Sequence, residues 1–142
     1  MITLTPGDVT LGQLEQIWRG DDQIALHPDT KAPIELAAAF VAKAAAGGAA
    51  VYGVNTGFGK LANVTIVESQ TAILQRNLIL SHCCGVGELL EAATTRMMMV
   101  LKLLSLGRGA SGVAWTTVAL ITEMLNKEVL PQIPVQGSVG AS

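Results

Sequence analysis

Charged side chains are scarce in this sequence of 142 residues, at 14% of the chain against roughly 25% in an average soluble domain. Half of the residues are hydrophobic, but only 4% are aromatic, so the apolar content is mostly small and aliphatic. Intrinsic disorder requires low hydrophobicity and high charge, and this composition excludes it. Because so little charge is available for a solvated surface, we expect the chain to cover much of its surface with partners or to be part of something larger.

Basic residues form no block, since nine Lys and Arg stand against eleven Asp and Glu for a net charge of −2. A nucleic-acid surface needs clustered cations to neutralise phosphates, so we expect no nucleic-acid partner. The charge-free stretch at 44–59 is rich in glycine and includes Asn55 and Thr56. It is shorter than the roughly 18 apolar residues of a membrane span. The polar N-terminus lacks the apolar core of a signal peptide, and we expect no membrane association.

Cysteine occurs twice, at the adjacent positions Cys83 and Cys84. This pair offers neither a disulfide framework nor the spacing of a metal site, so we expect no bound metal. Free cysteines commonly act as small buried hydrophobic residues, which is the interpretation we favour here. A reducing, cytoplasmic setting fits best.

Helical spacing of apolar residues predicts a mainly α chain. Thr10 is a candidate N-cap for the first helix, and the T-x-x-E pattern at 65–68 is a candidate capping box for the third. The fourth helix is apolar around most of its circumference, which predicts burial on nearly all sides. We expect helices at 11–18, from about 29 to 44, from the capping box to about 84, at 88–106 and at 113–126, a short extended segment at 24–26, and loops at 49–63 and 131–142.

The first loop contains a G-x-G-x-x-A pattern at 57–62. A dinucleotide-binding fingerprint also needs a second strand that ends in an acidic residue about 20 positions later. Here that region is Gln75-Arg76-Asn77, inside a predicted helix. We therefore interpret these glycines as turn residues, not as a phosphate cradle.

Three features of the loops and helix ends are candidates for chemistry, and each has a structural alternative. Tyr52 is the only tyrosine and lies in a glycine-rich loop, where it could also pack at the loop edge. His82 lies near a helix C-terminus, where a cap or a hydrogen-bonded residue is the more common role. The segment 137–142 consists almost entirely of very small residues. It can fold back sharply, or it can be a flexible end.

These motifs together resemble the aromatic amino-acid ammonia-lyases. The run YGVNTGFG at 52–59 is similar to the tyrosine loop of that family, and GSVGAS at 137–142 to the segment that leads into its self-processed Ala-Ser-Gly triad. LQRNL at 74–78 and SHCCGVG at 81–87 follow in the order of the family, and TLGQL at 10–14 fits its start. The resemblance implies the helical, fumarase/aspartase-like fold. It implies that residues 1–142 are a single N-terminal segment of a larger helical catalytic domain, incomplete on its own.

The dipeptide Ser81-His82 narrows the substrate. Members specific for histidine typically carry Ser-His there, whereas those specific for tyrosine or phenylalanine typically carry His-Leu or Phe-Leu. The resemblance therefore implies elimination of ammonia from L-histidine to give trans-urocanate. A tyrosine or phenylalanine ammonia-lyase or aminomutase remains an alternative, and a non-catalytic helical assembly module is an alternative of another class.

The cofactor of the family is a methylidene-imidazolone (MIO) made from its own backbone. The amide nitrogen of the triad glycine attacks the carbonyl of the alanine, and two waters are lost. The resemblance implies that Ala141 and Ser142 supply the first two residues of this ring. The glycine would be residue 143, so we expect the segment to be inactive by itself and to work with the remainder of the same protein after Ser142.

The resemblance also assigns roles to residues of the first loop. Tyr52 matches the catalytic tyrosine, which removes the β-proton of the substrate. Gly59, His82 and Asn55 are expected to bind the amino-acid substrate. A member of this family is expected to be a homotetramer.

Overall fold

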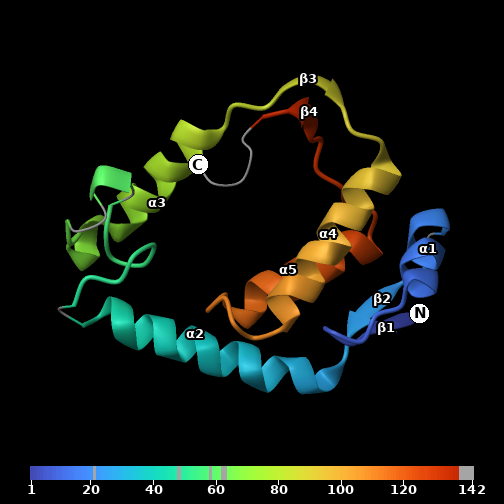
Figure 1. Cartoon of the computed structure of the whole chain (residues 1–142), viewed down its shortest axis with the longest axis horizontal. Coiled ribbons are helices and arrows are strands. Elements are labelled where there is room, and N and C mark those ends of the chain that lie inside the picture. Colours follow the sequence, from blue (N-terminus) through green and yellow to red (C-terminus); the bar gives the residue numbers. More distant parts are fainter. Residues whose placement is uncertain (21, 48, 58, 62–63, 138–142) are drawn as a thin grey trace. The chain divides into compact units, whose positions relative to one another are not determined.

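The computed structural model describes residues 1–142 apart from 21, 48, 58, 62–63 and 138–142. It is mainly helical, which confirms the predicted class (Figure 1). Short 3₁₀ turns occur at Pro28–Thr30 and Gly59–Leu61. The other elements are β1 (Ile2–Leu4), α1 (Leu11–Arg19), β2 (Ile24–Leu26), α2 (Lys31–Ala45), α3 (Glu68–His82), β3 (Val86–Leu89), α4 (Ala92–Gly107), α5 (Trp115–Asn126) and β4 (Pro134–Gln136).

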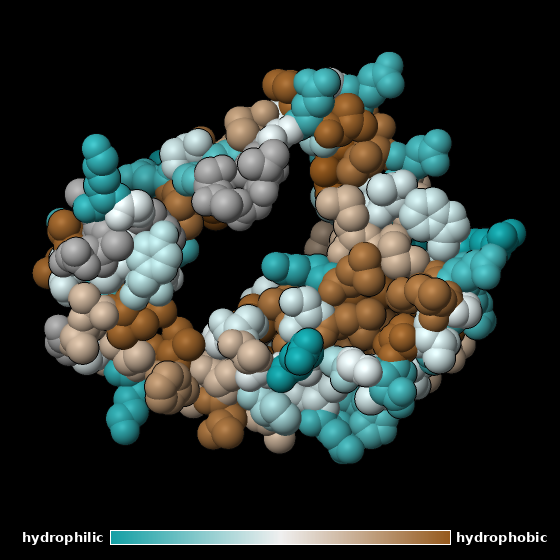
Figure 2. All heavy atoms as spheres, in the orientation of Figure 1, coloured by the Kyte–Doolittle hydropathy of each residue, from teal (hydrophilic) through white to brown (hydrophobic). Residues whose placement is uncertain are grey.

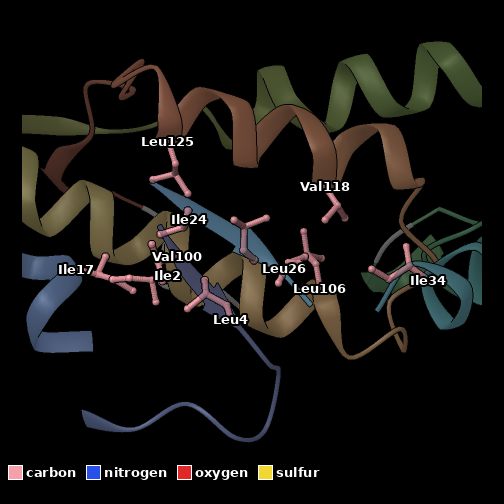
Figure 3. Close-up of a cluster of buried hydrophobic side chains, with 11 residues drawn as sticks. Ile2, Leu4, Ile17, Ile24, Leu26, Ile34, Val100, Leu106, Val118 and Leu125 are labelled. Carbon is pink, nitrogen blue, oxygen red and sulfur yellow. The ribbon is translucent and has the colours of Figure 1, made fainter. Parts of the chain in front are cut away.

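The chain divides into two compact units, residues 1–39 with 89–133 and residues 40–88 with 134–142. The first unit holds the hydrophobic core, in which β1 and β2 pair in parallel with Ile2 opposite Ile24 and Leu4 opposite Leu26. Helices α4 and α5 pack on each other, and both contact β2 (Figure 3). The core residues are apolar side chains from these four elements and from α1 and α2: Ile2, Leu4, Ile17, Ile24, Leu26, Ile34, Val100, Leu103, Leu106, Val118 and Leu125.

Helix α1 begins where the sequence predicts, because Thr10 caps it. The Thr10 hydroxyl accepts a hydrogen bond from the Gln13 N–H at 3.2 Å, and the Gln13 side chain accepts from the Thr10 N–H at 2.9 Å. This reciprocal capping box satisfies two of the N–H groups that a helix start leaves without partners. The helix then packs on α4 and buries Ile17 in the core.

Two polar side chains tie the first unit together through main-chain atoms. Asn126, the last residue of α5, accepts a hydrogen bond from the Ile24 N–H at 2.8 Å and donates one to the Ile24 carbonyl at 2.9 Å. Its amide thus pairs with the backbone of β2 as a neighbouring strand would. Arg96 of α4 is buried and donates to the carbonyls of Leu125 and Asp22, so it joins α5 to the turn before β2.

The third helix does not begin in the predicted way. Its N-cap is Val67, which makes no side-chain capping bond, so the predicted capping box at 65–68 is wrong. Thr65 instead forms an isolated antiparallel bridge with Thr56, across the loop. The hydrogen bonds of this bridge come from the neighbours of Thr65, Val64 and Ile66, and a local sequence pattern does not reveal such a pairing.

Helix α4 also departs from expectation, since it begins at Ala92 and not near 88. Residues 86–89 form β3, which pairs with β4 in a two-stranded sheet. Within the described chain α4 buries one face, including Val100 and Leu103, while Met98 and Leu101 are exposed. Burial on nearly all sides is therefore wrong for this segment, because α1, α5 and β2 pack against one face only.

The second unit contains α3, the loop before it and the β3–β4 pair. Cys83 and Cys84, directly after α3, are free and exposed, so the expectation that they are buried is wrong. They follow the end of the helix, outside any apolar cluster of the described residues. None of the described helices is both long and apolar enough to cross a lipid bilayer.

The two hydrogen bonds between the Asn126 side chain and the backbone of Ile24 predict that loss of this side chain destabilises the fold. Asn126→Ala leaves the N–H and C=O of Ile24, a residue only 1% exposed, without these partners. Each unsatisfied buried group costs about 1–3 kcal/mol, so for the two groups we expect a loss of roughly 2–6 kcal/mol in the free energy of unfolding. Urea denaturation measures it, with Thr116→Ala on the exposed face of α5 as the control. Equal midpoints for the two variants would contradict the assigned role.

Candidate functional site

The loop between α2 and α3 is shaped by a buried amide. Asn55 is 4% exposed, accepts a hydrogen bond from the Val51 N–H at 2.7 Å and donates one to the Ala49 carbonyl at 2.9 Å. These bonds close a turn over residues 51–55, in which the Val54 N–H also donates to the Val51 carbonyl. Main-chain N–H and C=O groups in a loop need hydrogen-bond partners, and the buried Asn55 side chain supplies them for Val51 and Ala49.

The far side of the loop is fastened by backbone pairing. The Gly57 N–H donates to the Val64 carbonyl at 3.1 Å, and the Ile66 N–H donates to the Asn55 carbonyl at 2.8 Å. These bonds flank the bridge between Thr56 and Thr65, and Thr56 is fully buried. Hydrogen bonds therefore hold the described parts of this loop, residues 49–57 and 64–66.

Tyr52 lies at the tip of the turn that Asn55 closes, and it is 63% exposed. The side chain is therefore presented on the surface of the segment, which suits a group that meets a ligand. Gly59, in the 3₁₀ turn that follows, has φ +58°. A residue with a Cβ atom would be strained in this left-handed backbone conformation, so the position favours glycine.

His82 is the last residue of α3, and its ring folds back onto the helix. Nδ1 lies 2.9 Å from the Leu78 carbonyl oxygen and 3.0 Å from the Ser81 hydroxyl oxygen. The Ser81 hydroxyl donates to the same Leu78 carbonyl at 3.0 Å. This is the hydrogen-bonded histidine at a helix C-terminus that was one of the two interpretations of the sequence. The contact with Ser81 was not predicted, because adjacent positions on a helix do not normally face each other.

The β3–β4 pair holds the start of the C-terminal segment. A Cβ added at Gly85 would lie 3.0 Å from Cγ of Pro134, and one at Gly137 would lie 3.4 Å from Cα of Gly85. A side chain at Gly85 would therefore crowd the ring of Pro134, so this position favours glycine, whereas a Cβ at Gly137 would make an ordinary contact with the backbone of Gly85. Ala141 and Ser142, predicted to become part of the cofactor, lie outside the described residues.

The structure brings four of the six predicted site residues into one compact unit. Tyr52, Asn55 and Gly59 share the loop before α3, and His82 ends that helix. A cavity of about 490 Å³ lies elsewhere, in the first unit, lined by Leu26, Trp115, Asn126 and neighbours. It includes none of the predicted residues.

In the described part of the chain, no three His, Cys, Asp or Glu side chains gather in a group that could hold a metal ion. The polar atoms at the predicted site are a phenol, an amide, a hydroxyl and an imidazole. Such groups can transfer protons and orient a small polar ligand.

Comparison with known proteins gives a consistent result. The chain is 67% identical over 141 residues to a curated histidine ammonia-lyase of Roseobacter denitrificans, which covers 99% of this chain and 28% of that protein. The chain therefore spans little more than a quarter of the length of this relative.

Solved structures agree with the fold. A histidine ammonia-lyase from Trypanosoma cruzi matches with a TM-score of 0.82 and 32% identity, over 98% of this chain and 27% of that one. The ergothioneine-degrading enzyme ergothionase from Treponema denticola matches with a TM-score of 0.89 and 26% identity, over 98% and 28% respectively.

A family model described as "Aromatic amino acid lyase" matches residues 9–142. The match includes the tyrosine loop, all of α3 and the small residues at the C-terminus. By sequence over nearly its whole length, the chain belongs to the aromatic amino acid lyase family.

Proposed function

We propose that residues 1–142 are the N-terminal segment of a larger helical catalytic domain, and that the whole protein eliminates ammonia from L-histidine to give trans-urocanate. The observation that carries this proposal is the 67% identity to a histidine ammonia-lyase across 99% of the chain. The dipeptide Ser81-His82, typical of the histidine-specific members, supports the choice of substrate.

Tyr52 is the proposed general base. It is displayed from a turn that the buried Asn55 closes, so its position relative to the loop is set by main-chain hydrogen bonds. Removal of a weakly acidic β-proton needs a base held close to the carbon, and a fixed loop supplies that placement. Asn55 and Gly59 complete the loop, and we propose that both also contact the substrate.

Ala141 and Ser142 are the proposed source of the MIO, together with a following glycine. The ring, when formed, supplies an electrophile that no ordinary side chain provides. Gly85 lies against the side chain of Pro134, the first residue of β4, so the strand that leads towards these residues is packed on the segment before β3. The very small residues after β4 leave the backbone free to fold back on itself.

Uncovered apolar side chains support a larger assembly, which we propose to be a homotetramer. Helix α3 has no buried residue among those described, and it exposes three large aliphatic side chains. Helix α2 exposes Leu36 and Phe40, and apolar surface is visible in Figure 2. Exposed apolar patches of this kind normally mark interfaces. The remainder of the protein and further copies of it would cover them. The two free thiols fit a cytoplasmic enzyme.

The phenol of Tyr52 provides the first test. In the full-length protein, Tyr52→Phe should lower kcat on L-histidine at least ~100-fold, the usual scale for a general base. The thermal midpoint should stay within a few degrees, which shows that the variant folds. Activity within a few-fold of the wild type would favour the non-catalytic helical module instead.

A substrate panel tests the assignment to histidine. We expect the full-length protein to release ammonia from L-histidine and to act far more slowly on L-tyrosine and L-phenylalanine, because His82 offers a polar partner for an imidazole. Steady-state kcat/KM for the three amino acids is the measurement. Turnover of tyrosine without turnover of histidine would establish the tyrosine-specific alternative.

Mass spectrometry tests the cofactor. A proteolytic peptide that spans Ala141 and Ser142 should weigh less than its sequence by two water molecules, since ring closure removes two. One of these waters carries away the serine hydroxyl, which the Ser142→Ala variant lacks. The peptide of this variant should therefore lose no more than one water relative to its own sequence, and its activity should be lost. An unmodified peptide from fully active protein, or any residue other than glycine after Ser142, would refute this cofactor.

A further inference from the structure

We propose that Ser81 is a positioning residue that fixes the tautomer of His82, so that His82 accepts a hydrogen bond from the imidazole N–H of the substrate. This inference rests on the proposed function and adds to it a residue that determines specificity. The Ser81–His82 pair at the end of α3 carries it.

The hydrogen-bond network assigns the proton of the His82 ring. A carbonyl oxygen has no hydrogen and can only accept, and the Leu78 oxygen lies 2.9 Å from Nδ1. Nδ1 must therefore carry the proton, because two lone pairs at that distance would repel each other. In the neutral ring the other nitrogen, Nε2, then has a free lone pair.

Ser81 makes this arrangement the preferred one. Its hydroxyl donates to the Leu78 carbonyl at 3.0 Å, so its only hydrogen is used there. The Ser81 oxygen, 3.0 Å from Nδ1, is then left as an acceptor. The N–H of His82 thus faces two oxygens. Moving the proton to Nε2 would lose the contact with the Leu78 carbonyl, and the Ser81 hydroxyl could keep its contact with Nδ1 only by giving up its own bond to that carbonyl. The same contacts hold the ring against the last turn of α3.

The consequence is a fixed acceptor that points away from the helix. A substrate with an imidazole N–H satisfies the Nε2 lone pair, whereas a phenyl ring leaves that lone pair without a partner. A site built to hydrogen-bond a substrate group rejects analogues that lack it, since its own polar atom is left unpaired. Ser81 would act on specificity in this way without touching the substrate.

The test compares three serine variants of the full-length enzyme on L-histidine. Ser81→Ala should raise KM about threefold to tenfold, the scale of one uncharged hydrogen bond, with kcat within about twofold. Ser81→Thr keeps the hydroxyl and should restore the wild-type KM. Ser69→Ala, at the exposed start of the same helix, is the matched control and should change neither constant.

Two unreactive inhibitors separate positioning from general damage. Binding of 3-(imidazol-4-yl)propanoate should weaken in Ser81→Ala by the same factor as KM, and binding of 3-phenylpropanoate should not change. An unchanged KM, a threonine variant as impaired as the alanine one, or equal weakening of both inhibitors would overturn the inference. If the wild type does not release ammonia from L-histidine, the proposed function fails first, and this result is distinct from the other three.

Discussion

Buried main-chain groups need hydrogen-bond partners, and in this chain polar side chains supply them where no strand or helix does. Asn126 pairs with Ile24, Arg96 donates to the carbonyls of Leu125 and Asp22, and Asn55 bonds the main chain of Ala49 and Val51 at the start of its turn. Each of these side chains connects segments that the backbone alone leaves apart. The core of the first unit and the tyrosine loop of the second both depend on them.

Hydrogen bonds between polar side chains and the main chain also hold the predicted site residues in place. The loop before α3 has no apolar cluster of its own among the described residues, and its shape comes from Asn55 and from the bridge between Thr56 and Thr65. Tyr52 can be exposed on a fixed loop because the amide beneath it is buried. His82 is held in a comparable way, by a carbonyl of its own helix and by the neighbouring hydroxyl of Ser81.

Apolar residues are distributed differently in the two units. The first unit has a core of its own, whereas α3 presents aliphatic side chains and buries none of those described. A helix of this kind gains its stability from elements that pack on it elsewhere.

Local chemistry in the sequence determined much of the structure. The cap at Thr10, the helical periodicity of α1, α2 and α5, and the glycine-rich loop with Tyr52 are recognisable because neighbouring residues decide them. Tertiary structure alone decided the pairing of β3 with β4, the bridge that displaces the predicted capping box, and which face of α4 is buried. It also decided the exposure of Cys83 and the partners of Asn55. The physical reason is that a short strand or a buried amide is stable only beside its partner, and the partner is often distant in the sequence, as Pro134 is from Gly85.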